Sequence, residues 1–358
     1  MSKCQLVIFL LFVACEAGAQ NSEQSSSREG AFTVTLGAEE HVPFSNIRFC
    51  PDEHVSFIKG PRAFSVWVTG DGGSWLFRGP NLARLSPAGK GPILPPTGKE
   101  HFDRDYVGLS AVIPAGDGKG FLGFYHAEFH PKAPSAFPFL ASLGLVTSAD
   151  GVTWKRAGQV IEGLENQLRP GNNHNIGACE PSAVIHQGPE GEFIYLYWGE
   201  YYYDRQGAIF VARAPRASDG RPGTWQKWTG SGWGVPGVQT VSESILKAPS
   251  KPPYLSYQMP HVSWNTVLKR WLMVFMSEEA IDVAASEDGI HFGPPIEIMR
   301  IPPFHMKLEE IFTAYPTLVS PQNGTQMLTG KEGFLYFARG PWGTNHSCWR
   351  RHFSISVE

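Results

Sequence analysis

The stretch S148-A-D-G-V-T-W154 recurs twice further along the chain, as S218-D-G-R-P-G-T-W225 and as S286-E-D-G-I-H-F292. The Asp-Gly pairs begin at residues 150, 219 and 288, so consecutive copies are 69 residues apart both times. Equal spacing indicates a repeated supersecondary unit. Each copy predicts a strand, an Asp-Gly turn that supplies positive φ, and an aromatic residue that begins the next strand.

Strand-like runs surround every copy. They cover 107–114, 120–128 and 141–147 before the first copy, 182–186, 193–203 and 208–214 before the second, and 261–264, 270–277 and 281–285 before the third. Each unit is therefore about four short antiparallel strands, which is one propeller blade. Runs at 54–58 and 63–69 begin another blade, and runs at 315–320 and 333–339 begin a last one.

The two ends of the chain complete this pattern. The final run, 351–357, leaves the last blade one strand short, and the run at 31–36 is expected to close the ring by pairing there. The count predicts an all-β fold, a five-bladed β-propeller with four antiparallel strands per blade. A pair of β-sandwiches or a larger barrel is the alternative, because short strands with turn signals also predict those folds.

The composition agrees with an all-β chain and excludes one class of partner. The chain has 39 Gly, 29 Pro, 11 Trp and 23 Phe, and only 18% of its residues are charged, which favours turns and strands over long helices. Its 30 Lys and Arg residues against 33 Asp and Glu residues give a formal net charge of -3. A nucleic-acid partner needs a concentrated basic face, so none is expected.

The N-terminus predicts secretion. Lys3, the apolar run 6–14 and Ala17-Gly18-Ala19 form a signal-peptide pattern, with cleavage near Ala19. Residues 1–19 are therefore assigned to a signal peptide, 20–30 to a disordered lead-in and 31–358 to a single propeller domain. The apolar run is too short for a membrane span, and no membrane association is expected. Sequons at Asn323 and Asn345 fit a secreted glycoprotein.

Three cysteines follow the predicted cleavage site: Cys50, Cys179 and Cys348. An odd number permits at most one disulfide, so the chain is not a cystine-stapled scaffold. Cys50 and Cys179 belong to blades that are not neighbours. The only bridge to consider joins Cys50 to Cys348, which lie in adjacent blades.

The first strand of each blade lines the central channel of a propeller, and its start points at one mouth. The five starts read C50-P-D-E-H-V55, D103-R-D-Y-V-G108, C179-E-P-S-A-V184, Q258-M-P-H-V262 and A314-Y-P-T-L318. Acids occur in the first three and not in the last two. A Glu is almost never buried without a partner. Because Glu180 stands at the head of a strand that is expected to be buried, we regard it as a candidate functional residue.

In these features the chain resembles the five-bladed glycoside hydrolases, the superfamily of family 43 arabinanases and xylosidases with relatives in families 32, 62, 68, 117 and 130. The resemblance implies that Glu180 is the general acid and that Asp52, with Glu53 beside it, is the general base. It implies that Asp105, or Asp103, tunes the pKa of the acid. The order Cys-Pro-Asp-Glu-His in the first blade departs from the Asp-Pro order common in the superfamily.

The chemistry explains why three acids would converge. Inverting hydrolysis of a glycoside needs a protonated carboxyl at the leaving oxygen and an ionised carboxylate that activates water. A third carboxylate nearby raises the pKa of the acid by repulsion and keeps it protonated near neutral pH.

Further candidates for substrate binding are weighed against ordinary structural roles. His126, Glu128 and His130 alternate along one strand, so their side chains share one side. That side is either a site for a metal or a sugar hydroxyl, or a solvated face. His126 resembles a sugar-contacting position of family 130. His261 begins the inner strand of the fourth blade, where family 43 relatives hold an ion or water. His174 belongs to the loop before Glu180. Trp198 either stacks against a bound sugar or packs in the hydrophobic core.

These features together predict a secreted, monomeric glycoside hydrolase that cleaves an extracellular polysaccharide or oligosaccharide by acid/base catalysis. No cofactor is required, although the resemblance permits a structural ion in the channel near His261. One alternative is a carbohydrate-binding propeller that has lost the chemistry. Another is a glycoside phosphorylase, which would need a cationic phosphate pocket, and the nearest basic residues in sequence are Arg104, Arg205 and Arg213.

Overall fold

The computed structural model describes residues 32–45, 47–99, 101–133, 137–172, 174–201, 207–248, 257–303, 311–341 and 345–357. Within these ranges the regular structure is β-strand, apart from two 3-10 turns at Arg216–Ser218 and Pro321–Asn323. The all-β prediction is confirmed for this part of the chain. The same residues include no helix with the length and apolarity needed to cross a bilayer. The predicted signal peptide and lead-in lie outside the described residues.

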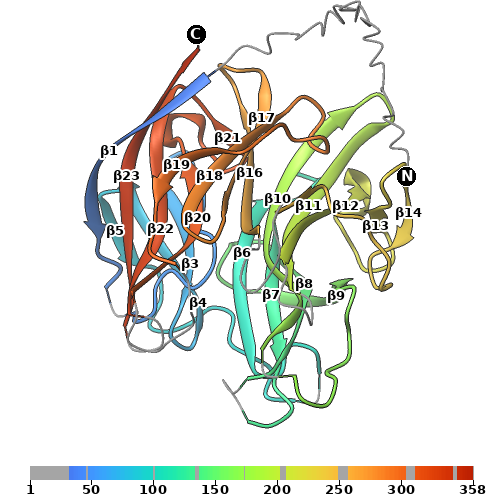
Figure 1. Ribbon diagram of the computed structural model, residues 1–358. Helices are drawn as coiled ribbons and strands as arrows, with labels where there is room; N and C mark the ends of the chain where they lie inside the picture. The colour runs from blue at the N-terminus through green and yellow to red at the C-terminus, as the bar shows by residue number, and fades with distance from the viewer. Residues whose placement is uncertain are drawn as a thin grey trace, which may run out of the picture.

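The strands of the described residues form four sheets (Figure 1). The first contains β2 (Ser56–Lys59), β3 (Phe64–Gly70), β4 (Gly73–Asn81) and β5 (Arg84–Pro87) in that order. The ten-stranded second sheet contains two antiparallel runs joined where β8 pairs with β10 in parallel. Its strands are β6 (Tyr106–Pro114), β7 (Phe121–Phe129), β8 (Leu140–Ser148), β9 (Lys155–Glu162), β10 (Ile176–Gly188), β11 (Gly191–Tyr201), β12 (Gly207–Pro215), β13 (Gln226–Trp228), β14 (Trp233–Pro236) and β15 (Leu246–Lys247).

The third and fourth sheets come from the C-terminal part of the chain. The third contains β16 (Gln258–Asn265), β17 (Arg270–Met276), β18 (Ala280–Ser286), β19 (Ile296–Arg300) and β21 (Leu328–Thr329). The fourth has the order β20 (Ile311–Val319), β22 (Glu332–Pro341), β23 (Ser347–Val357) and β1 (Phe32–Val42). The strand β1 pairs antiparallel with β23 from Phe32 opposite Val357 to Val42 opposite Cys348. The N-terminal strand thus joins the last sheet, as the sequence predicts.

Hydroxyl groups tie the first strand of one antiparallel run to the first strand of the next. The bonds run from Ser56 Oγ to Ser110 O (2.9 Å), from Val262 N to Ser182 Oγ (3.0 Å) and from Val55 N to Thr317 Oγ1 (3.2 Å). The strand β6 also contacts β10, and β16 contacts β20. These contacts place β2, β6, β10, β16 and β20 beside one another.

The three Asp-Gly pairs form the turns that the repeat predicts. Gly151, Gly220 and Gly289 have φ of 75°, 65° and 77°, a conformation that glycine adopts without steric cost. Each carbonyl accepts an aromatic donor: Trp67 Nε1 at 2.9 Å, Trp225 Nε1 at 2.7 Å and Tyr197 OH at 2.9 Å, respectively. Two of these donors lie in the preceding run of strands. The turns therefore fix how neighbouring runs pack.

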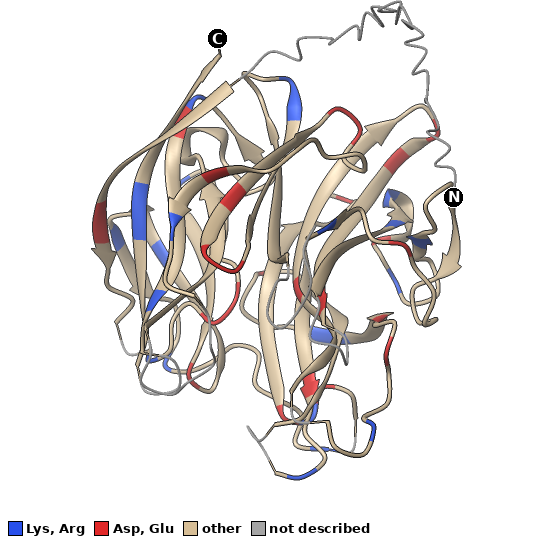
Figure 2. Cartoon of the chain, in the orientation of Figure 1, with Lys and Arg blue, Asp and Glu red and all other residues tan. Residues whose placement is uncertain are grey.

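The buried clusters lie between neighbouring groups of antiparallel strands and contain the aromatic residues of the repeat. Trp225 is buried, and Trp154 and Phe292 pack against buried clusters, as the sequence predicts. Cys50 and Cys348 are free thiols in one buried cluster. Figure 2 shows acidic and basic residues interspersed over the strands.

A buried lysine joins two segments of the second sheet. Lys227 is fully buried, and its Nζ donates to Glu162 O at 2.5 Å and to Gln239 O at 2.6 Å. We expect Lys227→Met to lower the free energy of unfolding by about 2–4 kcal/mol, because two backbone carbonyls lose a charged hydrogen-bond donor. Urea unfolding checks this value. Lys247→Met, at an exposed position of β15, is the matched control, and equal stability of the two variants would contradict the prediction.

Candidate active site

Three first strands share a local distortion that follows from an X-Pro pair. β10, β16 and β20 each have a bulge, and the residue before the proline has positive φ: 45° at Glu180, 54° at Met259 and 57° at Tyr315. Non-glycine residues are rare in this region, and such outliers cluster at functional sites. The bulges place Glu180 and Tyr315 at equivalent positions of their strands. Both side chains lie beside the same group of carboxyls.

Four carboxyl groups converge near the starts of the first strands. Glu180 is 5% exposed and Glu53 is 1% exposed, and Asp52 is partly exposed. The fourth is Glu128, near the end of β7. The convergence of Glu180 with Asp52 and Glu53, expected from the sequence, is present, and it joins acids from β10, from β7 and from the segment before β2.

The electrostatics of the cluster favour a protonated Glu180. Burial raises its pKa well above the ordinary value, the charge of His126 opposes this, and the carboxylates of Glu53, Glu128 and Asp52 raise it further. Burial, and then the Asp52 carboxylate, also raises the pKa of Glu53. Burial and mutual repulsion thus both favour the protonated forms of Glu180 and Glu53.

Asp52 has a different setting from that of Glu180. Its Oδ1 accepts a hydrogen bond from Tyr315 OH at 3.1 Å, and its backbone carbonyl accepts one from Tyr106 OH at 2.8 Å. Burial and then the Glu128 carboxylate raise its pKa to about 7, although the two tyrosines stabilise the carboxylate. A partly exposed carboxylate with a pKa near neutrality can accept a proton from water.

His126 bridges two of the acids. Its Nδ1 lies 2.8 Å from Glu53 Oε1, and its Nε2 lies 3.6 Å from Glu128 Oε1. The other oxygen of Glu128 is 2.5 Å from His130 Nε2. His126 and Glu128 of β7 and His130, which directly follows β7, therefore contact one another within the site.

The two candidate aspartates that precede β6, Asp103 and Asp105, are held by arginines. Asp103 is fully buried and binds Arg156 Nε at 2.7 Å, Tyr125 OH at 3.1 Å and His101 Nδ1 at 3.1 Å. Asp105 pairs with Arg104 Nε at 2.9 Å and accepts the backbone N–H of His130 at 2.7 Å. Partial burial raises the pKa of Asp105, and these bonds lower it overall. The structure brings Glu128 into the acid cluster instead of either aspartate.

The remaining candidates lie in varied surroundings. Trp198 is fully buried, stacks on Phe210 and donates Nε1 to Glu200 at 3.0 Å, which is the core role left open by the sequence. His174 is half-buried, and its backbone N–H donates to Asn172 Oδ1 at 3.3 Å. The ring of His261 lies 5.7 Å from that of His54. Burial lowers the pKa of both histidines, that of His54 to about 3.

Sequence reasoning missed three residues of the site: Tyr106, Tyr315 and Cys179. A signal for Tyr315 exists, because Tyr315-Pro316 repeats the pattern of Glu180-Pro181 at the start of an inner strand. Nothing comparable identifies Tyr106, which reaches Asp52 and Glu53 through tertiary packing alone.

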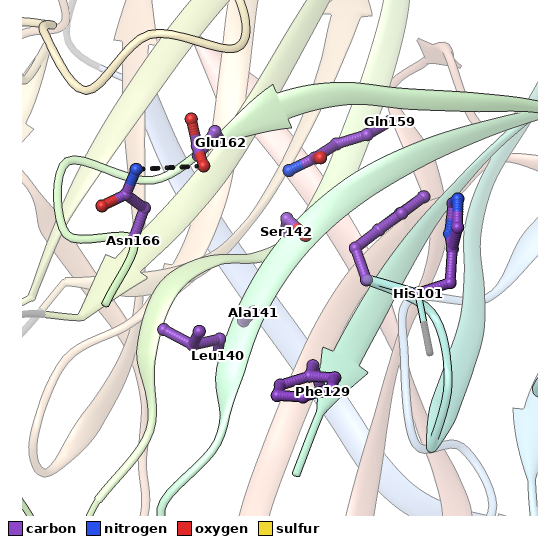
Figure 3. A pocket seen from close by; sticks show the side chains of 9 residues that line it. His101, Phe129, Leu140, Ala141, Ser142, Gln159, Glu162 and Asn166 are labelled. Atoms are coloured by element: carbon purple, nitrogen blue, oxygen red, sulfur yellow. Dashed lines mark hydrogen bonds between the residues drawn. The ribbon is translucent and has the colours of Figure 1, made fainter. Parts of the chain in front are cut away.

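A separate cavity of about 350 Å³ lies beside β7, β8 and β9. Its lining residues include Phe129, Ser142, Gln159, Glu162 and Asn166, and Asn166 Nδ2 donates to Glu162 Oε1 at 3.1 Å (Figure 3). The lining contains none of the four converging carboxyls. The acid cluster and this cavity are therefore separate features of the molecule.

Comparison with known proteins gives a likeness of fold. No family model and no curated protein matches the chain. Among solved structures, one described as a glycoside hydrolase is 11% identical with a TM-score of 0.53, and the match covers 92% of each chain.

A second solved structure, described as a candidate exo-β-1,3-galactanase from Bifidobacterium bifidum, is 11% identical with a TM-score of 0.52. The match covers 90% of this chain and 96% of that one. These alignments extend over nearly the whole chain, and identities this low establish the fold alone. The chain has the fold of the propeller glycoside hydrolases that its sequence resembles.

Proposed function

We propose that the protein is a glycoside hydrolase that cleaves an extracellular polysaccharide or oligosaccharide by acid/base catalysis. The observation that carries the proposal is the convergence of Glu180, Asp52, Glu53 and Glu128 at the starts of the first strands. The glycoside hydrolases among the structural neighbours support a carbohydrate substrate. Secretion remains a prediction from residues 1–19, and a monomer remains the expected state.

The proposal includes a five-bladed architecture. In it, β2–β5, β6–β9, β10–β14, β16–β19 and the set β20, β22, β23 and β1 are the five blades. The hydroxyl bonds between successive first strands support this ring, as does the pairing of β1 with β23. The first strands then surround one axis, and the acids lie at one end of it.

Each carboxyl has a role in the proposed reaction. Glu180, buried and protonated, donates a proton to the leaving glycosidic oxygen. Asp52, partly exposed and ionised above a pKa of about 7, removes a proton from water. Glu128 takes the tuning role expected of Asp105, since its charge raises the pKa of Glu180. Glu53 orients His126 through the Nδ1 hydrogen bond, and His126 and Glu128 are available to bind sugar hydroxyls.

An ion near His261 remains a proposal that the resemblance implies. Both ring nitrogens of His261 and Nε2 of His54 are buried without a hydrogen-bond partner among the described residues. His54 Nε2 and one of the two ring nitrogens of His261 would be the ligands, and the ion would link β16 to the segment before β2. No step of the proposed reaction depends on it.

The geometry disfavours the phosphorylase alternative. Arg104 pairs with Asp105, and Arg213 pairs with Glu190 at 2.7 Å and packs over Phe193, while Arg205 lies outside the described residues. The two described arginines are thus engaged with other groups. A binding protein without turnover is the remaining alternative, and it predicts glycan binding with no release of sugar.

The test is a screen of the purified full chain against 4-nitrophenyl glycosides and plant and algal polysaccharides. We expect release of nitrophenol or reducing sugar that depends on Glu180. Binding on a glycan array without hydrolysis in the same panel would favour the binding protein.

A glycine makes room for Glu53. A Cβ atom on Gly108 would lie 2.5 Å from Glu53 Cγ and 2.7 Å from Tyr106 OH. We expect Gly108→Ala to displace Glu53 and to reduce kcat/KM by about 10–100-fold, because small misplacements in an active site are costly. Gly232→Ala is the control, since nothing lies within 4 Å of its Cβ. Wild-type kinetics in the folded Gly108→Ala variant would show that the position of Glu53 is unimportant.

A further inference from the structure

The acid cluster also contains a thiol, which the proposed hydrolysis does not use. Cys179, His126 and Glu180 are all buried, and one potential ligand atom from each lies within 4.8 Å of the other two. Thiolate sulfur, imidazole nitrogen and carboxylate oxygen are the donors that Zn²⁺ accepts in proteins. The three residues come from β7 and β10.

The orientation of His126 suits a metal ligand. In the neutral tautomer with the proton on Nδ1, that nitrogen donates to Glu53 Oε1 at 2.8 Å and the lone pair on Nε2 is available. Nε2 is buried and lacks a hydrogen-bond partner among the described residues, since Glu128 Oε1 at 3.6 Å is too far. A histidine that ligates a metal nearly always donates its other ring N–H to a carboxylate or carbonyl, and this tautomer of His126 does so to Glu53.

The bulge in β10 explains how two adjacent residues reach one site. Successive side chains of a regular strand point to opposite faces. The register shifts between Cys179 and Ser182, and Glu180 has φ of 45°, so the alternation is broken at this point. Within the described part of the chain, the hydrogen-bond contacts of Cys179 Sγ are long, at 3.8 Å to Gly177 O and 4.0 Å to Asn175 Nδ2. Glu180 Oε2 is buried without a hydrogen-bond partner among the described residues.

We propose that Cys179 Sγ, His126 Nε2 and the Glu180 carboxylate form a binding site for Zn²⁺, whose occupancy inhibits hydrolysis. Three protein ligands leave a fourth position for water. The surrounding carboxyls of Asp52, Glu53 and Glu128 favour a dication, and the sulfur and nitrogen donors favour Zn²⁺ over Ca²⁺ or Mg²⁺. A metal-bound Glu180 carboxylate has no proton to donate, so Zn²⁺ would inhibit hydrolysis. This inhibition rests on the proposed function, whereas the binding of Zn²⁺ does not.

Metal binding is tested by titrating the metal-free full chain with Co²⁺, a spectroscopic substitute for Zn²⁺. We expect a thiolate-to-Co²⁺ charge-transfer band that saturates at one ion per chain and is abolished when Zn²⁺ is added. Cys179→Ser should remove the band, and Cys348→Ser, which changes a buried thiol outside the cluster, should retain it. Glu53→Gln should weaken Zn²⁺ binding by about 10–100-fold, because the supporting carboxylate is lost.

A folding control keeps the result interpretable. If circular dichroism shows that Cys179→Ser is unfolded, His126→Gln serves as the second variant and should also abolish stoichiometric binding. Absence of a charge-transfer band in the wild type, or a band that survives Cys179→Ser, would overturn the proposal. The glycosidase assay is a separate arm: binding without any hydrolysis in the panel would leave the metal site standing while the proposed function fails.

Discussion

Glu180→Gln is expected to reduce glycoside hydrolysis by about 10²–10⁴-fold, the usual contribution of a general acid. Glutamine has nearly the same shape as glutamic acid and cannot deliver the proton that the leaving oxygen requires. The loss should depend on the leaving group. Substrates with acidic phenol leaving groups need little protonation, so they should lose much less rate than alkyl glycosides or oligosaccharides.

The matched control for this variant is Glu297→Gln, at an exposed position of β19. It makes the same chemical change away from the cluster and should retain wild-type kinetics. A uniform loss of rate for all leaving groups in Glu180→Gln would point to a binding role for Glu180 and contradict its role as proton donor.

Asp52→Asn is expected to produce the second large loss, again about 10²–10⁴-fold, through removal of the general base. In the wild type the pKa of Asp52 is raised to about 7. The base acts only when ionised, so kcat/KM should fall as the pH falls through about 7 and should level off above it. The variant should lose this acidic limb, because asparagine does not titrate.

The pH dependence of kcat/KM from pH 5 to 9 measures this effect, with Asp117→Asn in an exposed turn as the control. An acidic limb that persists unchanged in Asp52→Asn would assign the base to another carboxyl of the cluster. Glu53 would then be examined by Glu53→Gln.

Much of the fold could be predicted because its signals are local. The Asp-Gly turns, the strand runs between them and the X-Pro pairs are all visible in the sequence, and the structure shows the turns at Gly151, Gly220 and Gly289 with positive φ. The N-terminal strand has no partner within its own part of the sequence, and it pairs with β23. Such features follow from backbone chemistry and need no knowledge of distant contacts.

The third carboxyl could not be predicted, because its place depends on register and on partners far away in sequence. A shift of one residue in a strand reverses which side chains face the site. The Asp103 side chain pairs with Arg156. Glu128 lies opposite Tyr106 where β6 pairs with β7, and this position lets its carboxyl reach the acid cluster. The approach of Cys179 to Glu180 depends on a bulge, which strand alternation does not predict.

The central claim is that Glu180 and Asp52 together cleave a glycosidic bond. The most direct measurement is the release of reducing sugar from the substrate found in the screen, by the wild type and by the folded double variant Glu180→Gln with Asp52→Asn. We predict turnover by the wild type and none above background by the double variant. Equal turnover by the two proteins would contradict the claim.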